Sequence, residues 1–181
     1  MQKIKLNDVK RYLKTLSKDE LEKELLNVYK NFKDVKDYLS IKIDEGNSEE
    51  ILIDYKNKIL DEFFPDKGIG KHDFNNIRKN ISNFKKVCSN NRQIVDLILY
   101  AVEQGVRYTN TYGDINENFY VNVGKLFIEA INHMIDNEIA IEYIKRCDKI
   151  VDDTSEVGWG FPDVMDEIFI ENLSDYIDFE E

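Results

Sequence analysis

Apolar residues recur along most of the chain at alternating steps of three and four, which is the period of an amphipathic α-helix. The clearest stripe consists of Phe74, Ile77, Ile81, Phe84 and Cys88. Residues 92–108 are apolar on more than one side, so we expect this stretch to form the central helix of the core. No stretch alternates for long with the period of two that a half-buried strand requires. The pattern therefore predicts an all-α fold.

Interruptions of this pattern divide the chain into eight or nine helices. Pro65 and Pro162 are the only prolines, and each stands where a helix should end or begin. Ser17 and Glu20 have the spacing of a capping box, which predicts a helix N-terminus. Asn7, Asn116 and the pair Asp114 and Glu117 are further cap candidates. The expected helices cover about residues 7–16, 17–31, 33–45, 49–64, 74–88, 92–108, 116–135, 138–153 and 162 onwards.

The connections between these helices are short, which favours antiparallel neighbours. We therefore expect an irregular bundle or a curved stack of antiparallel helical hairpins. No repeat of fixed period is present, so the sequence does not indicate a tetratricopeptide or HEAT array. A chain of 181 residues can bury a core of its own, and we expect residues 1–181 to form a single helical domain.

Composition is typical of a globular cytoplasmic protein. Hydrophobic residues make up 42% and charged residues 34% of the sequence, and no apolar run has the length of a signal peptide or a membrane span. Cys88 and Cys147 lie far apart without C-x-x-C spacing, as reduced cysteines do. We therefore expect a cytoplasmic location and no membrane association.

The net charge of −11 is unevenly distributed along the chain. Residues 111–181 contain 18 acidic and 4 basic side chains, whereas residues 1–38 contain 10 basic and 7 acidic ones. Such an acidic C-terminal part disfavours nucleic-acid binding. Solvated helix faces account for most of these charges. A minor hypothesis is that the acidic part imitates nucleic-acid phosphates and binds a basic partner.

Two segments contain residues that are unexpected in simple connections, namely 107–114 and 152–161. They combine hydroxyl, amide, carboxylate and aromatic groups, and the second contains the only tryptophan between two glycines. If they adjoin, their side chains could form a polar ligand site with an apolar wall. The candidate site residues are Tyr108, Thr109, Asn110, Tyr112, Asp114, Asp152, Asp153, Trp159 and Phe161.

The same residues also have a structural interpretation, because Thr, Asn and Asp side chains often bond backbone groups at helix ends. Trp159 is large and apolar, so we expect it to be mostly buried and to dock the last helix together with Phe161. Asp114, Asp152, Asp153 and Glu156 could bind a hard cation, but their order matches no EF-hand and chance explains it. We therefore expect no metal site.

No catalytic or cofactor-binding motif is present. The patterns G-x-S-x-G, H-E-x-x-H, G-x-G-x-x-G and the P-loop are all missing, and we expect no cofactor. His72 is expected in a loop or the first turn of a helix, and His133 in a partly buried packing position.

Four sequence stretches resemble an uncharacterised family of bacterial proteins known only as a domain of unknown function. They are YLKTLSKDEL (12–21), LYAVEQGV (99–106), TNTYGD (109–114) and DDTSEVGWGF (152–161). The resemblance spans most of the chain and implies a bacterial, cytoplasmic protein. It implies no activity and assigns no role to any residue.

The leading functional hypothesis is a helical protein-interaction module that binds a protein partner or a second copy, because amphipathic helices are abundant and catalytic motifs are missing. The alternative is a small-ligand or enzymatic site formed by segments 107–114 and 152–161.

Overall fold

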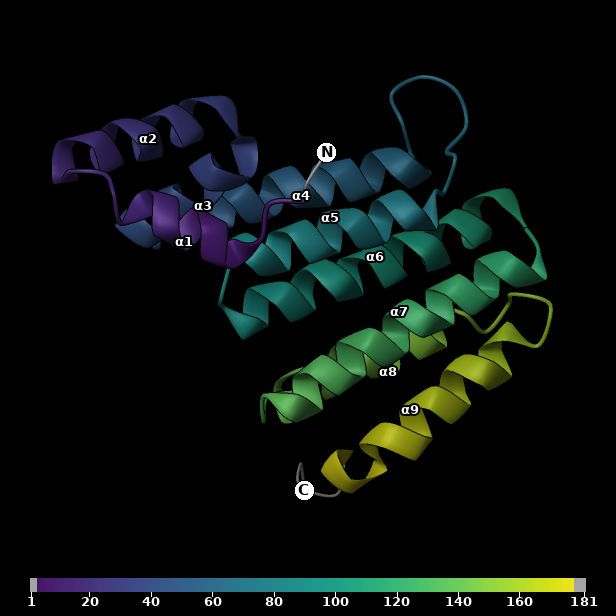
Figure 1. The fold of residues 1–181 in the computed structure, drawn as a ribbon. Helices are drawn as coiled ribbons and strands as arrows, with labels where there is room; N and C mark the ends of the chain where they lie inside the picture. Colours follow the sequence, from purple (N-terminus) through teal and green to yellow (C-terminus); the bar gives the residue numbers. More distant parts are fainter. Residues whose placement is uncertain (1–2, 178–181) are drawn as a thin grey trace.

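A computed structural model describes residues 3–177 of the chain. Within this range the chain forms nine α-helices and one 3₁₀-helix, without a strand (Figure 1), which confirms the all-α prediction. The helices are α1 (Leu6–Leu13), α2 (Lys18–Asn31), α3 (Lys33–Ile43), α4 (Asn47–Phe63), α5 (Phe74–Val87), α6 (Asn91–Tyr112), α7 (Glu117–Asp136), η1 (Ala140–Glu142), α8 (Ile144–Asp152) and α9 (Phe161–Ile177).

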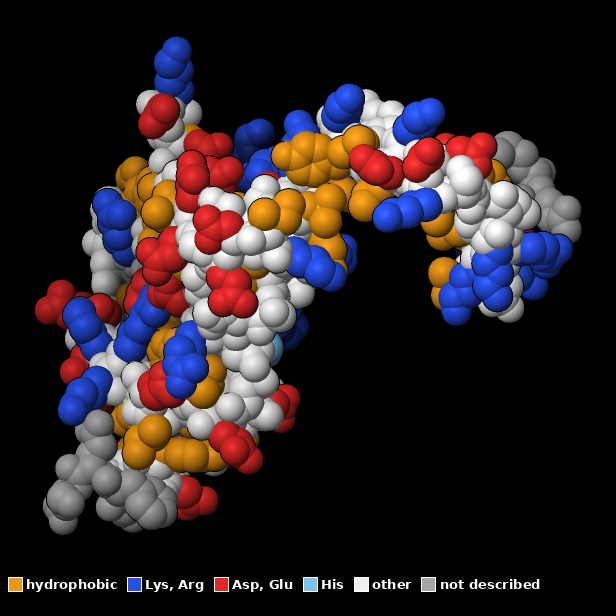
Figure 2. Space-filling model, turned by 90° about the vertical axis from the view of Figure 1, so that its left-hand side faces the viewer, with side chains coloured by type: hydrophobic (Ala, Val, Ile, Leu, Met, Phe, Trp, Pro, Cys, Tyr) orange, Lys and Arg blue, Asp and Glu red, His pale blue; other side chains and the backbone are white. Residues whose placement is uncertain are grey.

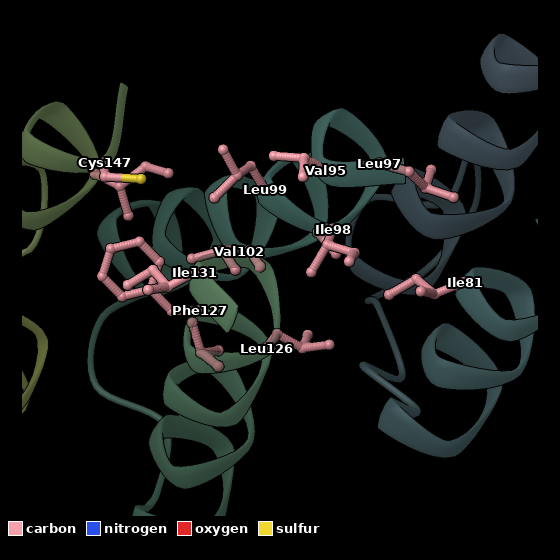
Figure 3. Close-up of a cluster of buried hydrophobic side chains, with 14 of the residues drawn as sticks. Ile81, Val95, Leu97, Ile98, Leu99, Val102, Leu126, Phe127, Ile131 and Cys147 are labelled. Atoms are coloured by element: carbon pink, nitrogen blue, oxygen red, sulfur yellow. The ribbon is translucent and has the colours of Figure 1, made fainter. Parts of the chain in front are cut away.

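Helix α6 is the central helix, as its all-round apolar pattern predicts. It packs against α4, α5, α7 and α8, and its pairing with α7 is the most extensive in the molecule. Figure 3 shows side chains of α6 and α7 filling one space, with Ile81 of α5 at one edge and Cys147 of α8 at the other. Gly105 permits the close approach of α6 and α7, because a Cβ there would lie 2.8 Å from Val123 Cγ2.

The remaining helices extend the stack on both sides of α6. Helices α4 and α5 cover one side, α3 packs on both of them, and α9 packs on α7 and α8. The connection after α4 is held close to the helix end: a Cβ at Gly70 would lie 2.1 Å from the carbonyl oxygen of Phe63, so only glycine fits. The result is a curved stack of consecutive helices (Figure 1).

Helices α1 and α2 form an arm (Leu6–Asn31) outside this stack. No residue of either helix is buried, and the main contact of the arm with the stack is that of α2 with α3. The two helices are linked by a hydrogen bond from Tyr12 Oη to Glu24 Oε1 (3.4 Å). Figure 2 shows the arm as a hook that projects from the body over an open hollow, with Lys and Arg side chains gathered at its outer end.

Most expected boundaries agree with the structure, with three exceptions. Ser17 and Glu20 form the expected capping box of α2, and Asn116 caps α7. Asn7, however, lies inside α1 rather than at its cap. Segment 109–112 is the last turn of α6 and not a loop. The expected helix 138–153 is divided into η1 and α8, which Tyr143 separates, and Glu138, between the end of α7 and η1, has a φ of 58° in the left-handed region.

No helix within residues 3–177 is long and apolar enough to cross a membrane.

Candidate functional site

The two polar segments lie side by side, although the residues that contact each other across them are 43 and 44 positions apart in the sequence. We call the pair, residues 107–114 and 152–161, the junction. Asn110 Nδ2 donates a hydrogen bond to the carbonyl oxygen of Asp153 (2.7 Å), and the backbone N–H of Gly158 donates to Asp114 Oδ1 (3.0 Å). The end of α6 is thereby fastened to the α8–α9 connection.

Asp114 and Tyr120 organise the inside of the junction. The Tyr120 hydroxyl donates to Asp114 Oδ1 (3.1 Å) and accepts from the backbone N–H of Ile115 (3.1 Å). The hydroxyl of Thr109, which is buried, lies 2.9 Å from that of Tyr120. A Cβ at position 158 would lie 2.4 Å from Asp114 Oδ2, so a larger residue there would displace this carboxylate. These contacts use the polar groups to tie helix ends.

A shallow depression of about 560 Å³ opens beside these contacts. Its lining is predominantly polar and includes four carboxylates. The lining residues are Thr109, Asn110, Gly113, Asp114, Asp152, Asp153, Ser155, Glu156 and Val157. Within residues 3–177, no group of three or more His, Cys, Asp or Glu side chains is arranged to hold a metal ion.

Five of the nine candidate site residues line this depression, and four do not. Those that line it are Thr109, Asn110, Asp114, Asp152 and Asp153. Tyr108 and Phe161 are buried in the core, and Tyr112 and Trp159 are exposed outside the depression. The expected apolar wall of Trp159 and Phe161 is therefore not part of the lining.

The expectation that Trp159 is mostly buried is wrong. Its side chain is 63% exposed, and its φ of 62° places it in a left-handed turn with Gly160. Phe161 alone fills the gap beneath the start of α9, where its ring lies 4.8 Å from that of Tyr120. Because Phe161 already occupies the space between the helices, the indole faces solvent.

The histidines occupy structural positions. His72 follows α4 in a loop, and its ring packs edge-on against Tyr108 and Phe119 at centroid distances of 5.4 and 5.3 Å. His133 is partly buried on α7, and its Nε2 lies 3.2 Å from Asn91 Oδ1. Burial lowers the pKa of His133, with a further contribution from Lys85.

An ion-pair network joins α4, α6 and α8. Lys56 Nζ lies 2.6 Å from Asp96 Oδ2, and Arg146 contacts both Asp96 and Glu103. Burial opposes ionisation of Asp96, but the hydrogen bonds from Lys56 and Arg146 outweigh it and lower the pKa of this carboxyl group. The neighbouring thiol of Cys147 is buried, and this raises its pKa to about 12. The network fastens helices together, and the thiol is un-ionised at neutral pH.

The most unusual surface of the molecule is the arm, which reasoning from the sequence did not single out as a site. Its exposed apolar side chains come from both helices: Leu6, Val9, Tyr12, Leu13, Leu21, Leu25 and Leu26. The signal was present in the sequence, because lysines 10 and 14 lie directly beside the apolar stripe of a helix only eight residues long.

The sequence profile of a family of unknown function, DUF6155, matches residues 4–172. The chain belongs to DUF6155. This match confirms the resemblance to a domain of unknown function. It includes the arm and the junction, so both are parts of the DUF6155 unit. No match was found among curated proteins or among solved structures.

Proposed function

We propose that this DUF6155 protein is a helical protein-interaction module that binds its partner through the arm. The observation that carries the proposal is that α1 and α2 bury none of their residues although both are amphipathic. Leu6 and Leu25 are 69% and 53% exposed. Clustered apolar side chains on an otherwise charged surface are typical of a face that another protein covers.

Two further observations support this proposal. The family match begins at residue 4, so the arm is a family feature and not an extension of this chain alone. The net charge of −11 favours a protein partner over a nucleic acid. We propose a cytoplasmic location, which the free cysteines Cys88 and Cys147 support because they are typical of a reducing compartment. We also propose that residues 1–181 form one domain.

A matched pair of substitutions tests the role of the arm. Leu25→Glu places a charge on α2, and Ile53→Glu places one at an equally exposed position (56%) on α4 of the body. Tagged protein is used to capture partners from a lysate of the cells that produce it. We expect the wild type and Ile53→Glu to retain the same partner, and Leu25→Glu to lose it. Equal retention by both variants, or no specific retention by the wild type, contradicts the proposal.

A second candidate function is the binding of a small cationic ligand in the depression at the junction. It is supported by the contact between the two polar segments and by the four carboxylates in the lining. Thermal unfolding with spermidine, an organic polyamine, tests it, because a ligand that binds only the folded state raises Tm. The double variant Asp152→Asn with Glu156→Gln should lose this rise. No shift of Tm with spermidine contradicts this candidate.

A further inference from the structure

The arm combines apolar and basic side chains on one side. Lys10 on α1 and Lys14, which directly follows α1, lie beside the stripe of Leu6, Val9 and Leu13, and within residues 3–177 neither lysine forms an ion pair. Residues 3–32 contain eight Lys and Arg against five Asp and Glu. A partner that covers this face must offer apolar side chains bordered by negative charge.

The outer face of α9 has the complementary properties. The inner side of the helix is buried through Met165, Ile168, Phe169 and Leu173. The outer side exposes Val164, Ile170 and Ile177. The helix also exposes five carboxylates and contains no basic residue: Asp163, Asp166, Glu167, Glu171 and Asp175. None of these five forms an ion pair within the described range 3–177, so the negative charge of α9 is uncompensated.

We propose that the protein forms a dimer in which the arm of each copy lies on the outer face of α9 of the other copy. The inference rests on the proposed function and names its partner. Within one copy, the arm and α9 lie at opposite ends of the stack (Figure 1), so the two faces meet only between copies. Two equal contacts related by a two-fold axis give a closed assembly.

Electrostatics favour this partner over a nucleic acid or an anionic membrane. The rest of the chain, residues 33–181, which we call the body, contains 17 basic and 31 acidic side chains and carries a net charge of −14. Phosphate-rich surfaces attract the arm but repel the body. The outer face of α9 instead offers the arm both the acidic and the apolar contacts that it lacks.

A charge exchange between the two faces tests the dimer. The first variant carries Lys10→Glu and Lys14→Glu on the arm, and the second carries Glu167→Lys and Glu171→Lys on α9. All four positions are exposed, so both variants should fold. By size exclusion with light scattering, we expect the wild type to have the mass of a dimer and each variant alone that of a monomer. An equimolar mixture of the variants should recover the dimer, because both contacts are then complementary again.

The control variant reverses two exposed carboxylates elsewhere, with Glu49→Lys and Glu50→Lys on α4, and it should remain a dimer. A wild type that is monomeric at all concentrations overturns the inference, as does a dimer that the α9 variant does not disrupt. If the protein is a monomer and the arm makes it co-sediment with anionic vesicles, the arm binds a membrane surface and not a second copy. If the protein is a monomer but still captures another protein in a way that depends on Leu25, the dimer is excluded and the proposed interaction function is retained.

Discussion

Helices α1 and α2 and helices α6 and α7 are both consecutive amphipathic pairs with short connections, residues 14–17 and 113–116, yet their environments differ completely. The first pair buries no residue, whereas half of the residues in the second pair are buried. Their apolar stripes look alike in the sequence. The comparison teaches that a stripe shows which face of a helix will be covered, but not whether the chain itself covers it.

The difference arises from the number of neighbours that each pair has. Helix α6 contacts helices on several sides, and α7 packs on α6 and α9, so their apolar atoms lose nearly all contact with water. The arm packs mainly on α3, through α2. The free energy from its apolar groups therefore remains available for binding, at about 25 cal/mol for each Å² that a partner covers.

The largest expected effect comes from the same truncation in both pairs. Leu126→Ala, at a side chain with 0% exposure on α7, should lower the free energy of unfolding by about 2–5 kcal/mol, because it leaves a cavity in the core. Leu25→Ala on the arm should change it by less than about 0.5 kcal/mol. Urea denaturation measures both values. If the two changes were equal, the arm would be packed in solution and the contrast would not hold.

Alanine substitutions at two glycines, one in α6 and one in α7, test how tightly these helices pack. Gly105→Ala should destabilise the fold by about 1–2 kcal/mol, because the added Cβ meets buried Val123 at 2.8 Å. Gly124→Ala on α7 should stabilise it by up to about 1 kcal/mol, because a Cβ there lies 3.6 Å from Ile168, at ordinary contact distance, and alanine favours a helix. Thermal unfolding should shift Tm in opposite directions. If both substitutions shifted Tm in the same direction, the distance between the helices would adjust to the added methyl group.

The fold could be predicted from local patterns because each helix carries its own signals. The stripe from Phe74 to Cys88 and the capping box at Ser17 depend on residues that are close in sequence, and the structure agrees with both. The end of α6 was placed too early because Thr109 and Asn110 have polar side chains typical of a connection. Their side chains instead form hydrogen bonds with Tyr120 on α7 and with Asp153 after α8, and no local pattern reveals these partners.

The candidate site was less predictable from the sequence, since its shape depends on which of several apolar side chains fills the space between the helices. The sequence indicated that segments 107–114 and 152–161 were unusual, and they adjoin. Hydrophobicity alone suggested that Trp159 is buried, but Phe161 fills the space beneath α9. Similarly, the stripes of α1 and α2 do not reveal that the chain leaves every residue of both helices unburied, although α3 packs against α2.

Lowering the pH should reduce the free energy of unfolding through protonation of Asp96. Its folded pKa is lowered from the ordinary value of 3.8, so this carboxylate stabilises the fold above that value and loses its contribution as the pH falls through the lowered pKa. Asp96→Asn should cost about 1–2 kcal/mol near neutral pH, since hydrogen bonds to charged groups contribute about this much. Urea denaturation near pH 7 and near pH 3 should show the deficit shrinking in acid. A deficit that is independent of pH contradicts this role.

The smallest expected effects come from removing one helix cap in each pair of helices. They distinguish the local stability of the arm from the global stability of the fold. Asn116 accepts a hydrogen bond from the backbone N–H of Phe119 at the start of α7, and Ser17 accepts one from that of Glu20 at the start of α2. Asn116→Ala should lower the global free energy of unfolding by about 1 kcal/mol, because α7 is part of the core. Ser17→Ala should leave the global value unchanged and speed hydrogen exchange only in α2, because the arm can fray while the body stays folded. Global destabilisation by Ser17→Ala would show that the arm unfolds together with the core.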